Sequence, residues 1–380
     1  MAKGQIDLTP APAVSINCPM KNANHVSQFC RLLSRQGLLK DNPLQVIDVG
    51  ARAGPQSHWG VFEEGGITVV GFEPCIEESD KLNREAAAGK FNVPFSCFPV
   101  ALGNANETAR LYEYPNQAAN SMTPHARVTK GYREIEVRRF DDFACLHGIG
   151  SVDFMKIDVE RHEPEVIQGL GKFLSDGEIL GFEIEVHFLD QSTNQCNPPL
   201  LSDIELLLRP HGYSLYDLDV FRGASWRLPS PVAWDHRDHN NQPILGPTIG
   251  GRMVNGDALF FRELREAPER DNIFKTKDVT RILKMAALFE VYGLPDCAVD
   301  MLLDFRELIE PVLPVDSLLN AFVPNHYGEG LTYPQYLETY RRHVGRVPSS
   351  SLAPTVSASP ELHSRSWRIF GGKKAKKEGL

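Results

Sequence analysis

The sequence lacks the cysteine spacing that would build a disulfide framework or a structural zinc site. Its seven cysteines are scattered, odd in number and never arranged as C-x-x-C. Such usage is typical of proteins kept in a reducing compartment. No apolar run approaches the roughly 20 residues that cross a bilayer, and the first residues lack the apolar segment of a secretory signal. We therefore expect a cytoplasmic protein without a transmembrane segment.

The sequence is also short of positive charge. It has 40 Lys and Arg against 49 Asp and Glu, which gives a net charge of −9 at pH 7. A protein that binds nucleic acid through a broad basic surface has the opposite excess. The composition therefore argues against a nucleic-acid partner, and the basic "KKAKK" near the C-terminus is typical of a solvated tail.

Four segments of the chain differ in pattern. Residues 1–24 are polar and contain prolines, and residues 346–380 are rich in serine, proline and lysine, so we expect a flexible arm and a flexible tail. Residues 25–266 alternate between strand and helix patterns. Residues 270–345 are helical in pattern and predict an α-helical extension to the main domain.

Apolar strands separated by helices predict an α/β fold with a Rossmann-like, mostly parallel sheet that binds ligands at the carboxyl ends of its strands. The last two strands, "YSLYDLDVF" and "DALFFRE", have the pattern of an antiparallel pair with a long insertion between them. Loops of this length in a compact domain are often functional lids. Trp226 and Trp234 in the insertion are candidates for stacking against an acceptor.

Two strand ends have the composition of a nucleotide-type site. "VIDVGARAG" places Asp48, Gly50 and Gly54 after the first strand, and "ITVVGFEP" places Glu73 at the end of the second. The G-x-x-x-G spacing fits neither the dinucleotide fingerprint nor a Walker A loop, which disfavours NAD and ATP. An acid after the second strand can accept hydrogen bonds from ribose hydroxyls. An acid for a ribose without a phosphate cradle favours S-adenosylmethionine.

The stretch "VDFMKIDVERHEPEV" combines a buried-strand pattern with charges. Lys156, Asp158 and Glu160 alternate with apolar residues, so we expect them on one face of the strand. Burying such charges is costly unless they pair with one another or with a ligand. One hypothesis is that Asp158 acts as a base or orients the acceptor. The alternative is a structural network in which Lys156 pairs with neighbouring acids.

The next strand, "ILGFEIEVHF", repeats this alternation with Glu183, Glu185 and His187. Glu185 and His187 are second candidates for a catalytic base. With Asp158 and Glu160 they would form a group of oxygen and nitrogen ligands that suits Mg²⁺ or Mn²⁺. The spacing is not diagnostic of a metal site, however, so a divalent cation is not predicted.

Taken together, these motifs resemble those of the FkbM-type S-adenosylmethionine-dependent methyltransferases. The resemblance covers roughly residues 40–263, through motifs that include "VIDVGARAG", "PVALGN", "VDFMKIDVERHEPEVIQG" and "GDALFFR". It implies a Rossmann-like class I methyltransferase sheet, mostly parallel with an antiparallel terminal strand. It also implies cofactor-binding residues at the ends of the first three strands, which are Asp48, Gly50, Arg52, Gly54, Glu73, Pro74, Ala101 and Leu102.

The resemblance further divides these residues among the parts of the cofactor. Asp48 and the two glycines would line its methionine end, Glu73 its ribose, and Ala101 and Leu102 its adenine. By resemblance alone, Ser121 would also approach the site. The expected activity is O-methylation of a hydroxyl on a sugar or on another small-molecule or glycan acceptor.

One position departs from the family pattern. The family usually has glycine after "KIDVE", whereas this chain has Arg161. A bulky cation there could bind an anionic group of a substrate or fill the acceptor site. Two alternatives to a methyltransferase stay open. One is a nucleotide-cofactor oxidoreductase, which the absent G-x-G-x-x-G disfavours, and the other is a non-catalytic module of the same fold in which Arg161 blocks the acceptor site.

Overall fold

The computed structural model describes eight stretches of the chain, which are residues 28–62, 65–124, 129–176, 179–189, 198–223, 252–263, 278–324 and 330–344. The predicted arm over residues 1–24 and the predicted tail over residues 346–380 lie outside the described residues. The same is true of Trp226 and Trp234 in the long insertion.

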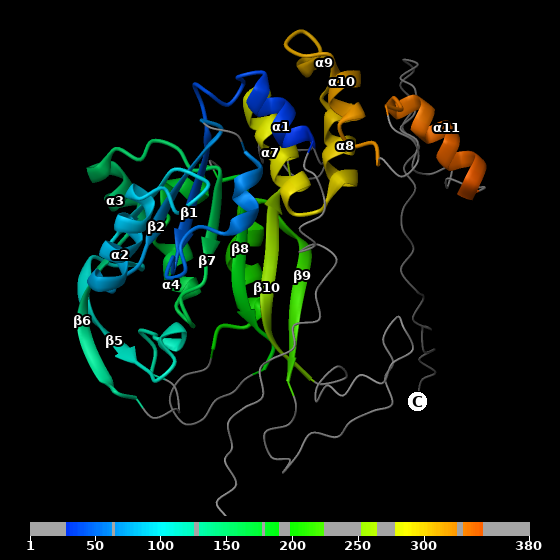
Figure 1. Ribbon diagram of the computed structural model, residues 1–380. Helices are drawn as coiled ribbons and strands as arrows, with labels where there is room; N and C mark the ends of the chain where they lie inside the picture. Colours follow the sequence, from blue (N-terminus) through cyan, green and yellow to red (C-terminus); the bar gives the residue numbers. More distant parts are fainter. Residues whose placement is uncertain are drawn as a thin grey trace, which may run out of the picture. The chain divides into compact units, whose positions relative to one another are not determined.

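A seven-stranded sheet forms the centre of the fold, in the order β3-β2-β1-β7-β8-β10-β9 (Figure 1). The first five strands in this order are parallel, whereas β10 is antiparallel to both β8 and β9. This arrangement confirms the predicted Rossmann-like, mostly parallel sheet with an antiparallel strand. The seven strands are β1 (Leu44–Val49), β2 (Ile67–Phe72), β3 (Phe95–Phe98), β7 (Phe154–Ile157), β8 (Gly181–His187), β9 (Tyr213–Gly223) and β10 (Arg252–Arg262).

One face of the sheet packs against helices that follow its strands. Side chains such as Ile47, Met155 and Ile184 alternate along the strands onto this face and are at most 1% exposed. They pack with buried residues of α3 to α6, as expected for apolar periods of 2 and 3.6 that meet in one core. The helices on this face are α3 (Phe140–His147), α4 (Glu163–Gln168), α5 (Lys172–Ser175) and α6 (Leu201–Leu208), and a further helix, α2 (Ile76–Ala87), follows β2.

The opposite face is covered by α7 (Val279–Val291) and the short helix η2 (Ser57–Val61). The buried ring of Trp59 lies edge-on to Phe154, with ring centroids 5.7 Å apart. Tyr292, which follows α7, packs on the same Phe154 ring at 5.1 Å. The helical segment, residues 278–324, thus covers the sheet through α7 and contributes to the core.

The helix α1 (Gln28–Arg35) lies beside α7 (Figure 1) and is capped from it. Oε1 of Glu290 accepts the backbone N–H groups of Gln28 and Phe29 at 3.0 Å each, and Oε2 accepts that of Cys30 at 2.8 Å. A carboxylate is well suited to the N–H groups and positive dipole end of a helix N-terminus. Three further helices follow α7 in the same unit, namely α8 (Pro295–Asp304), α9 (Arg306–Ile309) and α10 (Val315–Asn320).

A second, three-stranded sheet in the order β4-β6-β5 precedes α3. Its strands are β4 (Ala101–Leu102), β5 (Glu107–Glu113) and β6 (Gly131–Arg138), and the short helix η3 (Gln117–Ala119) follows β5. A small cluster of buried residues, including Leu111 and Val137, forms its own core. This sheet brings the chain between β5 and β6 to the carboxyl ends of the central strands.

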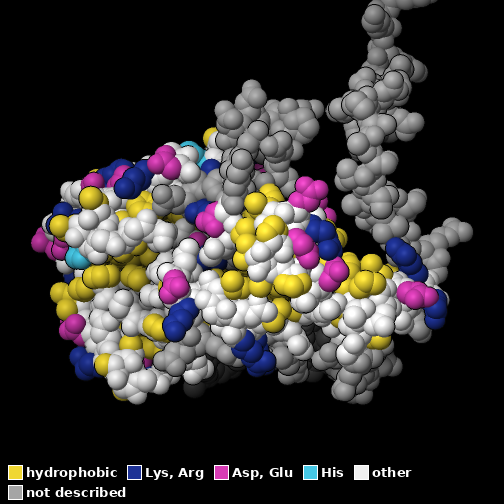
Figure 2. Space-filling view, turned by 90° about the horizontal axis from the view of Figure 1, so that it is seen from above, with side chains coloured by type: hydrophobic (Ala, Val, Ile, Leu, Met, Phe, Trp, Pro, Cys, Tyr) yellow, Lys and Arg dark blue, Asp and Glu magenta, His cyan; other side chains and the backbone are white. Residues whose placement is uncertain are grey.

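Contacts divide the chain into two units, Met1–Pro324 and Asn325–Leu380. In the second unit the structure describes α11 (Tyr333–Val344), along which the rings of Tyr336 and Tyr340 lie tilted to each other with centroids 5.9 Å apart. Among the described helices, none combines the length and the apolar character that a membrane span requires. Figure 2 shows acidic and basic side chains interspersed with apolar ones over the face seen from above.

Candidate active site

A cavity lies at the carboxyl ends of β1, β2 and β7, where an α/β sheet binds its ligands. Its empty volume is about 590 Å³, part of which is open to solvent. The walls come from the ends of the three strands, the chain after β3, and the segment between β5 and β6. The lining residues are Val49, Gly50, Arg52, Phe72, Glu73, Pro74, Ala101, Leu102, Leu111, Gln117, Ala118, Asn120, Met122, Asp158, Val159 and Glu160.

The structure brings most of the predicted cofactor residues to this one cavity. Six of the eight line it, whereas Asp48 and Gly54 lie behind its wall. Gly54 has φ +78°, and a Cβ there would lie 2.8 Å from the Phe91 ring. Glycine at this position therefore lets the Phe91 ring pack against the backbone. Gly50 has φ +90°, and its Cβ would lie 2.0 Å from the carbonyl oxygen of Asp158. Gly50 therefore allows the ends of β1 and β7 to meet.

Asp48, Lys156 and Asp158 form a charged chain beside the cavity. The Lys156 ammonium donates a 2.8 Å hydrogen bond to Oδ2 of Asp158 and lies 4.0 Å from Oδ1 of Asp48. Burial raises the pKa of Asp48 to about 6, although the charge of Lys156 opposes this. Burial alone would lower the pKa of Lys156, but Asp48 and Asp158 raise it above its usual value. Lys156 is therefore an ammonium that orients the Asp158 carboxylate.

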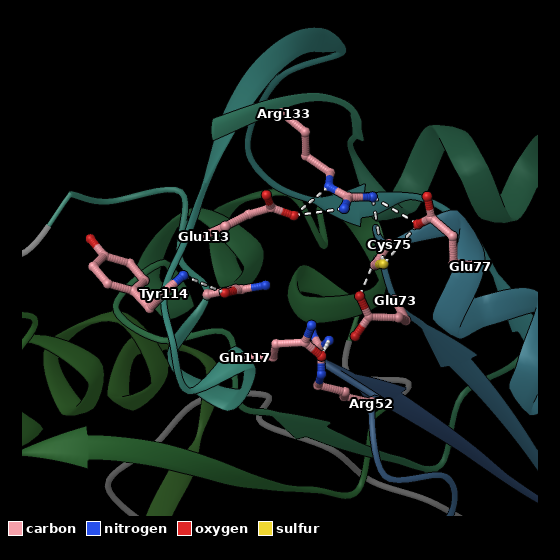
Figure 3. Close-up of polar contacts among 9 residues, drawn as sticks. Arg52, Glu73, Cys75, Glu77, Glu113, Tyr114, Gln117 and Arg133 are labelled. Atoms are coloured by element: carbon pink, nitrogen blue, oxygen red, sulfur yellow. Dashed lines mark hydrogen bonds and ion pairs between the residues drawn. The ribbon is translucent and has the colours of Figure 1, made fainter. Parts of the chain in front are cut away.

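The second acid at the cavity is Glu73, which is 4% exposed. Its Oε1 accepts the backbone N–H of Cys75 at 2.8 Å, which fixes the carboxylate against the start of α2 (Figure 3). Burial raises its pKa, and the hydrogen bond from Cys75 and the charge of Arg52 oppose that rise. Glu73 thus presents a fixed carboxyl group to a ligand in the cavity.

Side chains from the small sheet close the cavity opposite Glu73. Arg52 donates a 2.8 Å hydrogen bond to Oε1 of Gln117, which joins the loop after β1 to η3 (Figure 3). Arg133 on β6 bridges Glu113, at 2.6 Å, and Glu77 of α2, at 2.7 Å. The small sheet is therefore tied to both sides of the cavity by arginines, as bidentate guanidinium geometry allows.

Several lining residues were missed by the sequence analysis. Leu111 and Met122 add apolar surface beside Ala101 and Leu102, and Gln117 and Asn120 add amides. They lie on or after β5, in a part of the chain where no motif marks a site. Only the pairing of β5 with β6 brings them to the cavity, so the local pattern had no signal for them.

The prediction that Lys156, Asp158 and Glu160 share one face of a strand is wrong for Glu160. The strand β7 ends at Ile157, and Glu160 and Arg161 have φ values of +56° and +85°. The backbone leaves the sheet after Asp158, whose N–H still donates to the Val49 carbonyl at 3.0 Å. Glu160 reaches the cavity from a loop, because the left-handed residues redirect the chain.

The acids of β8 lie on the α7 side of the sheet and do not line the cavity. Glu183 is in register with Lys156, and both of its oxygens accept hydrogen bonds, from Gln56 and from Tyr292, each at 2.8 Å. Glu183 is thus a structural acid. Among the described residues it links the sheet, η2 and the end of α7.

Glu185 and His187 follow along the same face. Burial, together with the charges of the neighbouring Asp158, Glu160 and Glu163, raises the pKa of Glu185 to about 8. Asn255 donates to its Oε1 at 2.9 Å, and Oε2 has no hydrogen-bond partner. Burial lowers the pKa of His187 to about 4, so both side chains are uncharged near pH 7.

No group of three or more His, Cys, Asp or Glu side chains within the described ranges is arranged to hold a metal ion. The candidate acids pair with a lysine, with an amide and with a backbone N–H group.

The part of the chain that contains this cavity is similar to a known family. Residues 48–215 match the model of the methyltransferase FkbM domain. The resemblance to FkbM-type methyltransferases is thereby confirmed for these residues, which include every residue that lines the cavity. The family match and the sheet together support a methyltransferase.

Other similarities are more distant. The AMB antimetabolite synthetase AmbE of Pseudomonas aeruginosa is 24% identical over 218 residues, a match that covers 48% of this chain but only 10% of AmbE. TehB from Haemophilus influenzae aligns over 58% of each chain with 11% identity and a TM-score of 0.28. The YcgJ protein from Bacillus subtilis aligns over 63% of this chain and 99% of its own, with 13% identity and a TM-score of 0.30. These structural likenesses are weak, and the fold of this chain is assigned from its own sheet order.

Proposed function

We propose that this protein is an S-adenosylmethionine-dependent methyltransferase that methylates a hydroxyl oxygen on a sugar or on another small-molecule or glycoconjugate acceptor. The observation that carries the proposal is the pairing of two carboxyl groups in one cavity, Glu73 at the end of β2 and Asp158 after β7. Glu73 suits the two hydroxyls of a ribose, and Asp158 accepts a hydrogen bond from Lys156.

The residues present fit this cofactor. Phe72, Leu102, Leu111 and Met122 supply an apolar wall that suits an adenine ring. Glu73 is a fixed acceptor for the two ribose hydroxyls. Arg52, Gln117 and Asn120 supply donors for a carboxylate, and a guanidinium pairs well with that group.

The bound cofactor supplies a methyl group that is electrophilic because it is attached to a sulfonium. The chain then has to hold an acceptor hydroxyl in line with this methyl group and remove the hydroxyl proton. Asp158 suits the second task, because Lys156 donates to its Oδ2 and leaves Oδ1 to accept the proton. Lys156 also keeps the carboxylate oriented while the proton moves.

The acceptor class is proposed from two observations. The similarity to a segment of an antimetabolite synthetase favours a small molecule. Glu185 is uncharged near neutral pH although it is close enough to Asp158 for their charges to interact, so an uncharged acceptor such as an alcohol suits the surroundings of Asp158.

The cofactor is tested by calorimetry with S-adenosylhomocysteine, NAD and ATP. We expect only S-adenosylhomocysteine to bind, and Glu73→Gln to weaken it about tenfold, because a hydrogen bond to a charged acceptor is lost. Glu85→Gln on α2 is the matched control and should bind as wild type, because Glu85 pairs with Lys90 and does not line the cavity. Binding of NAD without S-adenosylhomocysteine would overturn the proposal. Labelled S-adenosylmethionine supplied to a cell extract with the protein would then identify the methylated product.

A further inference from the structure

The loop between β7 and α4 has an unusual backbone. Glu160 and Arg161, at φ +56° and +85°, are the only non-glycine residues with positive φ in the part of the chain that the structure describes. An L-residue in this conformation is strained, because its Cβ approaches the backbone. Such a conformation persists only where the surroundings hold it, and it is common at functional sites.

Two buried side chains hold this loop. Ser121, which is fully buried, donates a short hydrogen bond from its hydroxyl to the Glu160 carbonyl oxygen. Oε1 of Glu163, also fully buried, accepts the backbone N–H groups of Val159 and Arg161 at 3.1 Å each. One contact comes from the chain after β5 and the other from the first turn of α4, so the loop is held from both sides.

The held residues are also residues of the cavity. Asp158, Val159 and Glu160 line it, whereas Ser121 and Glu163 do not. A rotation of the strained pair into an ordinary conformation would move the Glu160 carbonyl and the Arg161 N–H together, because they belong to one peptide group. The cavity wall therefore depends on contacts made outside it.

We propose that Ser121 and Glu163 are positioning residues, which hold Glu160 and Arg161 in the left-handed conformation and so keep Asp158 and Glu160 at the cofactor cavity. This inference rests on the proposed function for its effect on the cofactor. It also accounts for the buried state of Glu163. Burial raises its pKa to about 8, and a proton on Oε2, which has no hydrogen-bond partner, leaves Oε1 able to accept both N–H groups.

The test uses a second-site rescue. Ser121→Ala should weaken S-adenosylhomocysteine binding about tenfold, as expected when a strained conformation loses one of its supports. Because glycine adopts positive φ without strain, adding Arg161→Gly should bring the affinity to within about threefold of the Arg161→Gly single variant. His162→Gly is the control, since His162 has φ −116° and gains nothing from glycine. Glu163→Gln keeps an acceptor at Oε1 and should bind as wild type, whereas Glu163→Ala should not.

Hydrogen exchange of the Val159 and Arg161 amides gives a second measurement that needs no ligand. We expect faster exchange in Ser121→Ala and Glu163→Ala, and protection restored by Arg161→Gly in the Ser121→Ala background. If His162→Gly restores protection equally, or if Ser121→Ala changes neither exchange nor affinity, the inference is overturned. If wild type fails to bind S-adenosylhomocysteine while the exchange pattern is as expected, the proposed function fails and the support of the loop stands.

Discussion

The phenol of Tyr292 donates a 2.8 Å hydrogen bond to Oε2 of Glu183, across 109 residues of sequence. Tyr292 ends the first helix of the helical segment, and Glu183 lies on β8 next to Lys156. The charge of Glu183 contributes to raising the pKa of both Lys156 and Asp48. The helical segment is therefore in contact with the charged residues that surround the proposed base.

Tyr292→Phe tests this contact. The substitution keeps the ring packing and removes a hydrogen bond to a buried carboxyl group, so we expect a loss of about 2 kcal/mol in the free energy of unfolding. Tyr213→Phe is a matched control, because its buried hydroxyl donates at 2.7 Å to the neutral carbonyl of Ile179. That variant should lose about 1 kcal/mol. Urea denaturation measures both, and equal losses would contradict a special role for Glu183.

Glu290→Ala removes the carboxylate that caps α1. Three backbone N–H groups lose their acceptor in a buried setting, so we expect a destabilisation of about 3 kcal/mol. Asp278→Ala, which removes an exposed cap of α7 from the N–H of Thr280, should cost about 1 kcal/mol. Thermal unfolding of the two variants gives the comparison. A Glu290→Ala protein as stable as Asp278→Ala would show that α1 does not need its remote cap.

Asp158→Asn tests the proposed base. The amide keeps the size of the side chain but does not take up a proton, so turnover should fall about a hundredfold or more. Affinity for S-adenosylhomocysteine should change less than threefold, since the proposed role is in proton transfer. Single-turnover assays with labelled S-adenosylmethionine and calorimetry measure the two quantities. Undiminished turnover would remove Asp158 from the mechanism.

Stability should fall as the pH rises from about 6.5 to about 8. The folded-state pKa of Glu163 and of Glu185 is raised to about 8 from 4.5, so over this range the folded protein holds protons that the unfolded chain has lost. Stability then decreases with pH by at most about 1.4 kcal/mol per pH unit for each group. His187, whose pKa is lowered to about 4 from 6.5, gives an opposite trend that is confined to lower pH.

Urea denaturation at several pH values between 6.5 and 8 measures this slope. Glu163→Gln should flatten it, because a neutral amide replaces the group that titrates. Glu165→Gln on the same helix, whose side chain is only partly buried, is the control and should keep the wild-type slope. A wild-type stability that is constant or rises over this range would show that neither buried acid retains its proton.

Much of the fold could be predicted because its signals are local. The strand that ends at Val49 and the one that ends at Phe72 are apolar runs followed by a glycine or an acid, and both strands form as expected. Parallel order then places Gly50 and Glu73 at one edge of the sheet, where the cavity lies. Periodicity and strand order were sufficient for this half of the site.

The other half depends on contacts that no local pattern contains. The alternation through Lys156 and Asp158 continues to Glu160, yet the strand ends first, because Ser121 and Glu163 hold a left-handed loop. The alternation of charges is the same whether the backbone stays extended or turns. The resemblance offers one signal here, because the family usually has glycine at the position of Arg161, which has φ +85°, and glycine is the usual marker of such a turn.

The remote cap of α1 also bears on how this protein is made. The carboxylate of Glu290 lies 260 residues after the Cys30 amide that it binds, and Lys284 joins Asp153 across 131 residues. At roughly 5 to 20 residues per second, a ribosome needs on the order of tens of seconds to supply these partners. The helix α1 therefore leaves the ribosome with its N-terminal amides uncapped. We expect its docking against α7 to belong to the last steps of folding, after the sheet has been synthesised.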